Sequence, residues 1–139
     1  MSREVVRLVI PARTEYLILA RLALAGIARG TPIDEATLAD LKLAVTEACG
    51  NAVRHAQLAE HGVVHVDFGL ADGAIEIRVE DSGPGIGALP VTEAHERDEL
   101  AESGMGLAII RALVDELEIV DRESGPGTVV RMRKRLAAA

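Results

Sequence analysis

The fold of this chain is decided by three short segments: Glu47-Ala48-Cys49-Gly50-Asn51-Ala52-Val53-Arg54-His55, Asp81-Ser82-Gly83-Pro84-Gly85-Ile86 and Ser103-Gly104-Met105-Gly106-Leu107. In the first segment, Glu47, Asn51 and His55 recur every four residues and so share one flank of a predicted helix. The second segment follows a predicted strand, and the third begins a predicted helix. Each segment is a weak signal alone, but their order and spacing predict that all three meet in one pocket.

Length and composition indicate one globular domain that spans residues 1–139. Apolar residues make up 49% of the chain and charged residues 27%, which is typical of a protein with a hydrophobic core. We expect that core to be aliphatic, because Phe68 and Tyr16 are the only aromatic residues. The net charge of −7 and the scarcity of aromatic side chains argue against nucleic acid as the main partner.

Cysteine content and hydropathy exclude further classes. Cys49 is the only cysteine, which leaves neither an internal disulfide nor a cysteine-rich metal site. The most apolar early stretch runs from Leu17 to Ala28, contains Arg21 and is too short to cross a bilayer. We therefore expect a cytoplasmic protein that has no membrane partner.

Alternating apolar and polar residues predict the strands. One is expected at residues 3–10, ended by Pro11, and a hairpin is expected from residues 64–70 and 75–79 around the turn 71–73. Two closing strands are expected at residues 119–120 and 129–133. The basic run 131–135 alternates like an edge strand, so we interpret it as a solvated face rather than a binding patch.

Helical spacing predicts three helices, at about residues 15–28, at residues 35–55 with Asp34 as N-cap, and from Leu107 through Leu117. Periodicity disappears at about residues 87–104, which is typical of a functional lid or of a disordered loop; we predict an ATP lid there. The expected fold class is α+β. We predict a two-layer α/β sandwich in which a mixed, mostly antiparallel sheet is covered on one face by helices.

Glu47 and Asn51 lie off the apolar stripe of the second predicted helix. A solvated helix face explains such a pair without any function. The functional interpretation is that the amide oxygen of Asn51 ligates Mg²⁺ beside phosphate and water oxygens. Glu47, one turn away, then accepts a proton from an incoming hydroxyl group. His55 continues the same flank, where a capping or packing role is the ordinary one.

The two glycine segments have different predicted chemistries. Asp81 ends a strand, and its carboxylate can accept a hydrogen bond from an exocyclic amine such as adenine N6, although a plain turn also explains this segment. Ser103 to Gly106 begins a helix, where backbone N–H groups can bind phosphate, although a hinge also explains these glycines. The sequence contains no P-loop motif, and the glycines after Asp81 lead into the lid instead of a helix, which excludes a Rossmann site.

Together, the three segments resemble the N, G1 and G2 boxes of the GHKL ATPase superfamily, and Gly127-Thr128 is similar to a glycine–threonine pair on that family's last strands. The resemblance covers about residues 35–133 and implies the Bergerat-type fold with an ATP lid. The compact chain, the Ser-Gly-Met-Gly-Leu form of the third segment and Glu47 four residues before Asn51 resemble the anti-sigma factor serine-protein kinase branch.

The resemblance implies a site and its cofactors, ATP and Mg²⁺. Glu47 is the implied general base for a serine hydroxyl of a partner protein, Asn51 is the implied Mg²⁺ ligand, and Asp81 is the implied acceptor for adenine N6. The remaining implied ATP-binding residues are Gly83, Gly85, Ile86, Ser103, Gly104, Met105, Gly106, Leu107 and Thr128. The implied partners are a small STAS-type anti-anti-sigma protein as substrate, a sigma factor, and a second copy in a homodimer.

One position departs from the family pattern. Glu102 stands where some members carry an arginine just before Ser-Gly-Met-Gly, and loss of a lid cation slows a phosphoryl transfer that depends on charge stabilisation. Two alternatives therefore stay open beside the anti-sigma kinase. One is a switch kinase of a stress-signalling scaffold, and the other is a catalytically weak, nucleotide-gated protein-binding module.

Overall fold

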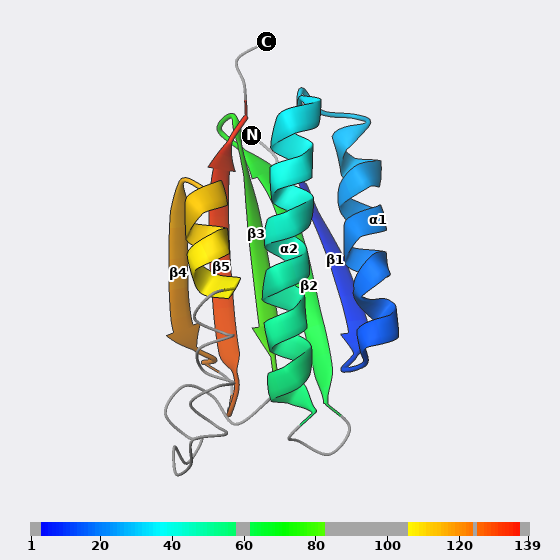
Figure 1. Ribbon diagram of the computed structural model, residues 1–139, viewed down its shortest axis with the longest axis vertical. Coiled ribbons are helices and arrows are strands. Elements are labelled where there is room, and N and C mark those ends of the chain that lie inside the picture. Colours follow the sequence, from blue (N-terminus) through cyan, green and yellow to red (C-terminus); the bar gives the residue numbers. More distant parts are fainter. Residues whose placement is uncertain (1–3, 58–61, 83–105, 124, 137–139) are drawn as a thin grey trace.

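The computed structural model describes residues 4–57, 62–82, 106–123 and 125–136. One helix that has no label in Figure 1 covers residues 106–113. The other elements, in chain order, are β1 (Glu4–Pro11), the short 3₁₀ helix η1 (Thr14–Tyr16), α1 (Leu17–Ala28), α2 (Glu35–Ala56), β2 (Val63–Ala71), β3 (Ala74–Asp81), β4 (Glu116–Asp121) and β5 (Thr128–Arg135). The predicted lid at about 87–104 lies outside the described residues.

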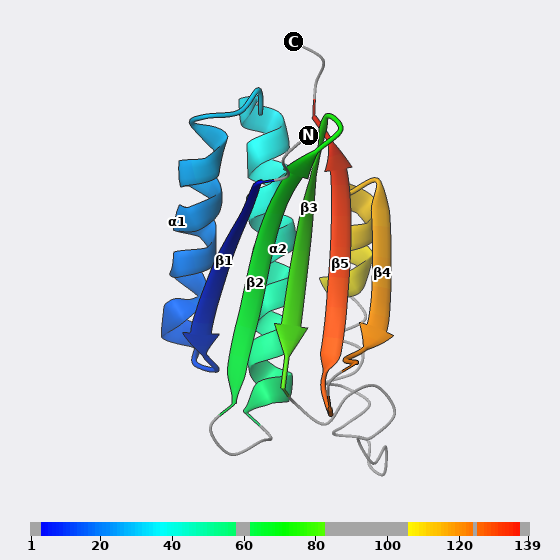
Figure 2. The ribbon, with the colours of Figure 1, turned by 180° about the vertical axis from the view of Figure 1, so that it is seen from behind.

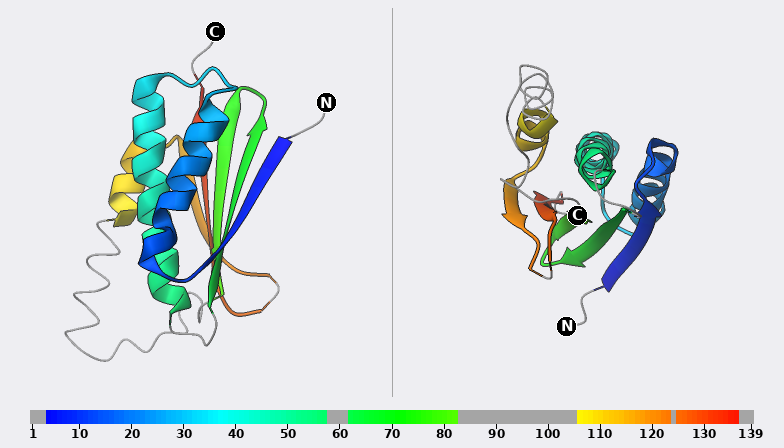
Figure 3. Two further views of the ribbon diagram at one scale, coloured as in Figure 1. Left: turned by 90° about the vertical axis from the view of Figure 1, so that its right-hand side faces the viewer. Right: turned by 90° about the horizontal axis from the view of Figure 1, so that it is seen from below.

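The strands form one five-stranded sheet in the order β1-β2-β3-β5-β4. Every described pairing is antiparallel, so no parallel pair occurs among the described strands. All described helices cover the same face of this sheet (Figures 1 and 3), and the opposite face carries none of them (Figure 2). The predicted two-layer α+β architecture is confirmed. No helix in the described ranges is long and apolar enough to cross a membrane.

The core lies between the sheet and the helices. Alternate residues of the central strands point into it, and Phe68 of β2 is its largest fully buried side chain. Leu41, Val45 and Ala48 of α2 are fully buried against it, as the apolar stripe of the sequence predicts. The interior is therefore aliphatic around a single phenylalanine.

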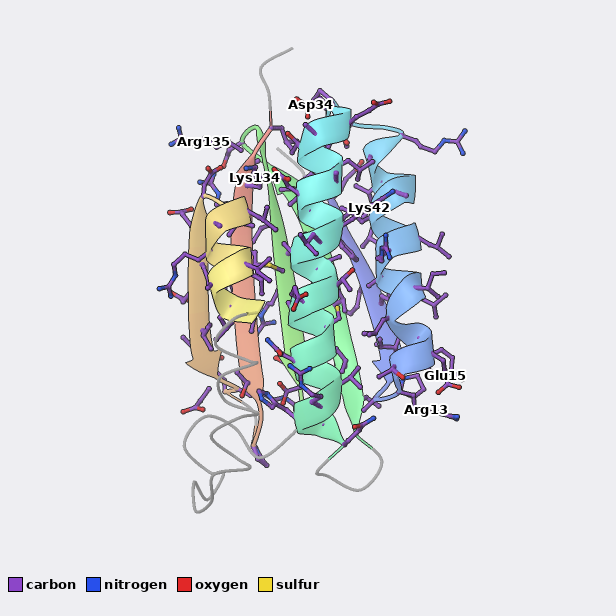
Figure 4. All side chains as sticks on the ribbon, viewed as in Figure 1. Arg13, Glu15, Asp34, Lys42, Lys134 and Arg135 are labelled. Carbon is purple, nitrogen blue, oxygen red and sulfur yellow. The ribbon has the colours of Figure 1, made fainter. Side chains whose placement is uncertain are left out.

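Two local signals in the sequence are confirmed where the predicted elements begin and turn. The Asp34 side chain accepts a hydrogen bond of 2.7 Å from the Thr37 N–H, which caps α2 and lowers the pKa of Asp34. The β2–β3 hairpin turns at Asp72 and Gly73, whose φ angles of 54° and 71° suit a tight two-residue turn. Figure 4 shows Asp34 at the start of α2.

The sequence predicts a helix from Leu107 through Leu117, and the predicted end of this helix is wrong. Helix ends at residue 113, and Leu117 belongs to β4. Leu117 lies four residues after Leu113, which fits a helix, but two residues before Ile119, which fits a strand. In β4 these two side chains are half-buried against the core opposite Met132 and Val130. Packing against β5 decides between the two periods.

The edge-strand interpretation of residues 131–135 is also wrong. β5 lies between β3 and β4, so its backbone pairs on both sides. Arg131 faces the open side of the sheet and forms ion pairs with Glu76 on β3, at 3.0 Å, and with Glu118 on β4, at 3.4 Å. The face is solvated as predicted, but alternation along one strand carries no information about that strand's place in the sheet.

Candidate nucleotide-binding site

Three buried side chains of the described chain are polar or charged: Asn51, Asp81 and Thr128. Their exposed fractions are 6%, 3% and 4%. Burying such groups costs free energy unless they are hydrogen-bonded, so they are uncommon in a small core. All three are residues for which the sequence predicts a role in binding. Burial therefore selects the same positions as the motifs.

Asp81 and Thr128 lie side by side on the helix-covered face of the sheet. They are direct partners across the β3–β5 pair, and Asp81 is also paired with Val64 on β2. Gly127 lies close to the main chain of Asp81, because a Cβ built at Gly127 would stand 2.0 Å from the Asp81 carbonyl oxygen. With a φ of 144°, this position requires glycine. The predicted Gly127-Thr128 pair is thus brought against Asp81.

The Glu47–Asn51 flank of α2 meets the first described residue of the helix that covers residues 106–113. A Cβ built at Gly106 would stand 3.0 Å from Oε2 of Glu47 and 3.5 Å from Nδ2 of Asn51. Glu47 is half-buried and Asn51 is buried, so a solvated helix face does not describe Asn51. The first and third sequence segments therefore meet, with glycine leaving the space between them.

Two contacts at this end of α2 are absent from the predictions made on the sequence. Nδ1 of His55 lies 3.6 Å from Oδ2 of Asp81, and the Arg54 guanidinium contacts Oδ1 of Asn51. The sequence could have indicated His55, because it lies one helical turn after Asn51. No sequence pattern indicated Arg54. The first contact joins α2 to β3, and the second, within α2, places a cationic group beside the Asn51 amide oxygen.

The chain is also held where it leaves β3. Oγ of Ser82 lies 3.2 Å from the Val63 nitrogen, which donates to it, and 3.4 Å from the Val63 carbonyl oxygen. Residue 82 is the last described before the gap, so Gly83, Gly85 and Ile86 lie outside the described residues, as do Ser103, Gly104 and Met105. Leu107 is described, and its half-buried side chain packs against the core.

The available donors fit a magnesium ion that arrives with a nucleotide. Among the described residues, no group of three or more His, Cys, Asp or Glu side chains is arranged to hold a metal. Mg²⁺ is commonly bound through one or two protein oxygens together with substrate phosphates. The buried amide of Asn51 offers such an oxygen, which lies 3.9 Å from where a Cβ at Gly106 would stand.

Cys49, between Glu47 and Asn51, plays no part in this chemistry. It points into the core and is fully buried, and that burial raises the pKa of the thiol to about 12. A thiol in this state is neither a nucleophile nor a metal ligand near neutral pH.

Comparison with known proteins decides the family. The pattern of the histidine kinase-like ATPase domain family matches residues 10–134. The chain belongs to this family. Serine-protein kinase RsbW of Bacillus velezensis is 36% identical over 143 residues, covering 97% of this chain and 88% of that protein. Its counterpart in Bacillus subtilis is 34% identical over 145 residues, with the same two coverages. These relatives assign the chain to the serine-protein kinase branch of the GHKL family.

Solved structures share the fold. The RsbU and RsbW domains of Rv1364c from Mycobacterium tuberculosis match with a TM-score of 0.71 and 24% identity, over 98% of this chain and 33% of that chain. The catalytic domain of the histidine kinase ThkA matches with a TM-score of 0.56 and 16% identity, over the whole of both chains. The helix-covered antiparallel sheet is thus the fold of known members of the family.

Proposed function

We propose that this GHKL-family serine kinase transfers the γ-phosphoryl group of ATP, with Mg²⁺, to a serine of a small STAS-type anti-anti-sigma protein, and that it also binds a sigma factor as an anti-sigma factor. The observation that supports this most strongly is the burial of Asn51 on α2 and of Asp81 and Thr128, which pair where β3 ends and β5 begins. The similarity to serine-protein kinases supports a serine as the residue that accepts the phosphoryl group.

In the proposed mechanism, Asp81 accepts a hydrogen bond from adenine N6, with Thr128 and the glycines after Asp81 around the base. The phosphates extend toward the N-terminal side of the helix that includes residues 106–113, because backbone N–H groups at a helix N-terminus favour anions. Asn51 would hold Mg²⁺ through Oδ1, the oxygen that Arg54 contacts. Bound Mg²⁺ supplies positive charge to the phosphates during transfer.

Glu47 is the proposed general base. It is half-buried, its Oε2 lies at the Gly106 end of the site, and it is one helical turn from Asn51. Its carboxylate takes the proton of the acceptor serine while the serine oxygen attacks the γ-phosphorus. The bond from that phosphorus to the bridging oxygen breaks, and ADP leaves. The phosphoserine product and ADP account for all atoms of the serine and ATP.

The test uses γ-labelled ATP and Mg²⁺ in an extract of the native cell, with the wild type beside Glu47→Ala. We expect one small labelled protein that carries acid-stable phosphoserine. Its labelling rate should fall by roughly 10² to 10⁴ in Glu47→Ala, the contribution of a positioned base. ATP affinity should be retained. Glu35→Ala, an exposed glutamate at the other end of α2, is the matched control and should label normally.

The outcomes separate the candidate functions. Equal labelling by the wild type and Glu47→Ala would contradict the role of Glu47 as base. A preparation that binds ATP but labels no protein in a Glu47-dependent way would favour a nucleotide-gated binding module instead. Labelling of a large scaffold protein would favour the switch kinase.

A further inference from the structure

The contact between His55 and Asp81 joins the two layers of the fold at the proposed base-binding end. His55 lies in the last turn of α2 and keeps 33% of its side chain exposed, whereas the Asp81 side chain on β3 is 3% exposed. The histidine is thus the outer partner of a buried carboxylate. Any role of His55 in nucleotide binding rests on the proposed function, because that function gives Asp81 its role toward adenine.

The position of the Asp81 main chain is fixed without help from His55. Val64 and Thr128 pair with Asp81 from the two neighbouring strands, and Gly127 approaches its carbonyl oxygen closely. Strand pairing does not fix rotation of the carboxylate about its Cβ–Cγ bond, because terminal torsions of this kind are broad. Recognition of an amino group depends on that rotation, since a hydrogen bond weakens steeply away from its preferred direction.

His55 contacts one defined oxygen of this carboxylate. The 3.6 Å between Nδ1 and Oδ2 lies within ion-pair range and is longer than an ordinary N–H···O hydrogen bond. An N–H at Nδ1 therefore attracts Oδ2 and restrains the rotation without taking up the acceptor capacity of the carboxylate, which has about four lone-pair directions. A restraint that is set before the ligand arrives improves binding by lowering the cost of ordering.

We propose that His55 is a positioning residue that orients the Asp81 carboxylate and thereby sets the preference of the site for purines with a 6-amino group. The residue acts through Asp81 and not on the phosphates. Loss of His55 should therefore weaken the binding of nucleotides that carry the 6-amino group and leave the binding of nucleotides without it unchanged.

The experiment measures, by titration calorimetry with Mg²⁺, the affinity of the full chain for ATP and for its analogue that lacks the 6-amino group. In His55→Leu, ATP affinity should fall about tenfold, at the low end of what residues that orient a ligating group contribute. The affinity for the analogue should not change. His55→Gln, which keeps an N–H donor, should restore most of the discrimination. His65→Leu, a half-buried histidine on the open face of the sheet, is the matched control and should bind both nucleotides normally.

Thermal unfolding of each variant is measured beside the titrations, and His55→Ala, which also removes the N–H donor, provides the reading if His55→Leu does not fold. A wild type that binds both nucleotides equally would contradict the role of Asp81, and with it both the base recognition in the proposed function and this inference. A wild type that discriminates while His55→Leu discriminates equally well would overturn only the inference. Equal losses for both nucleotides would also overturn it, because they indicate a general structural role.

A double-mutant cycle gives a second, independent reading. If His55 acts through Asp81, then Asp81→Asn should remove most of the effect of His55→Leu on ATP affinity, and the two losses should not add. Additive losses would overturn the inference even where His55→Leu alone weakens ATP.

Discussion

Charged side chains are arranged differently on the two faces of the sheet. On the open face, charged side chains stand in paired rows across the strands, such as Arg7 with Asp67 at 2.9 Å and Arg133 with Glu116 at 3.3 Å. On the helix-covered face, Asp81 is the charged residue that is buried among those the structure describes. Its chain neighbour Glu80 points to the open face and pairs with Arg78 and Arg122, both at 3.2 Å. Burial, and not the density of charge, distinguishes the site.

The open face also contains shallow hollows. One of them is lined by Arg7, His65, Asp67, Arg78 and Glu80. Such a hollow has the ion pairs but not the buried polar groups of the opposite face, and exposed pairs of this kind contribute little free energy. A depression with paired, exposed charges is a weaker indication of function than a buried amide on α2 and a buried carboxylate at the end of β3.

The largest expected difference between the faces is in stability. Phe68→Ala removes the largest buried side chain and should lower the free energy of unfolding by about 3–5 kcal/mol, because the core loses apolar contacts and retains a cavity. Val5→Ala, on a residue of the open face that is 49% exposed, should change it by less than about 0.5 kcal/mol. Urea unfolding measures both, and similar values would contradict the one-sided core.

A second comparison concerns two aspartates of the same sheet. Asp81→Asn should weaken ATP binding by about tenfold or more, since an amide is a poorer acceptor for an amino group than a buried carboxylate. Asp67→Asn, on the open face opposite Arg7, should leave ATP affinity unchanged. Calorimetric titration of both variants against ATP measures the difference. Equal affinities would place the base of the nucleotide elsewhere.

A smaller effect than the loss at Phe68 is expected for the ion pairs of the open face. Hydrogen bonding to Glu76 raises the pKa of Arg131, so this guanidinium stays charged at any ordinary pH. Its side chain is nevertheless 47% exposed, and Arg131→Ala should cost less than about 1 kcal/mol of unfolding free energy. That cost should shrink in about 1 M salt, where exposed charges are screened. A larger loss that salt does not change would indicate that the ion pairs hold the sheet together.

Capping of α2 gives a test at the end of the helix away from the site. The hydrogen bond from Thr37 lowers the pKa of Asp34 in the folded protein below its ordinary value of 3.8. The ionised Asp34 cap therefore stabilises the fold fully when the pH is above 3.8. This stabilisation is lost as the pH falls through the lower pKa of the folded state. Asp34→Ala should therefore be less stable than the wild type near neutral pH and equal to it in acid. Thermal unfolding of both proteins across this pH range measures the difference in stability. The Asp34→Ala substitution should leave ATP affinity unchanged.

Much of the fold and of the site was predictable because the signals are local. The Asp34 cap, the turn at Asp72-Gly73 and the stripe of α2 each depend on residues a few positions apart. The spacing of Glu47 and Asn51 fixed their shared flank for the same reason, and alternation along β3 fixed that Asp81 shares a face with Val79.

Only the tertiary structure decided what lies beside each of these residues. The contact of His55 with Asp81, the approach of Gly106 to Glu47 and the interior place of β5 all join segments that are distant in the sequence. Periodicity determines which way a side chain points within its own element, whereas its neighbours depend on strand order and on how helices pack across the sheet. For that reason the sequence determined the residues of the candidate site, and the packing of α2 on β2 and β3 decided their arrangement.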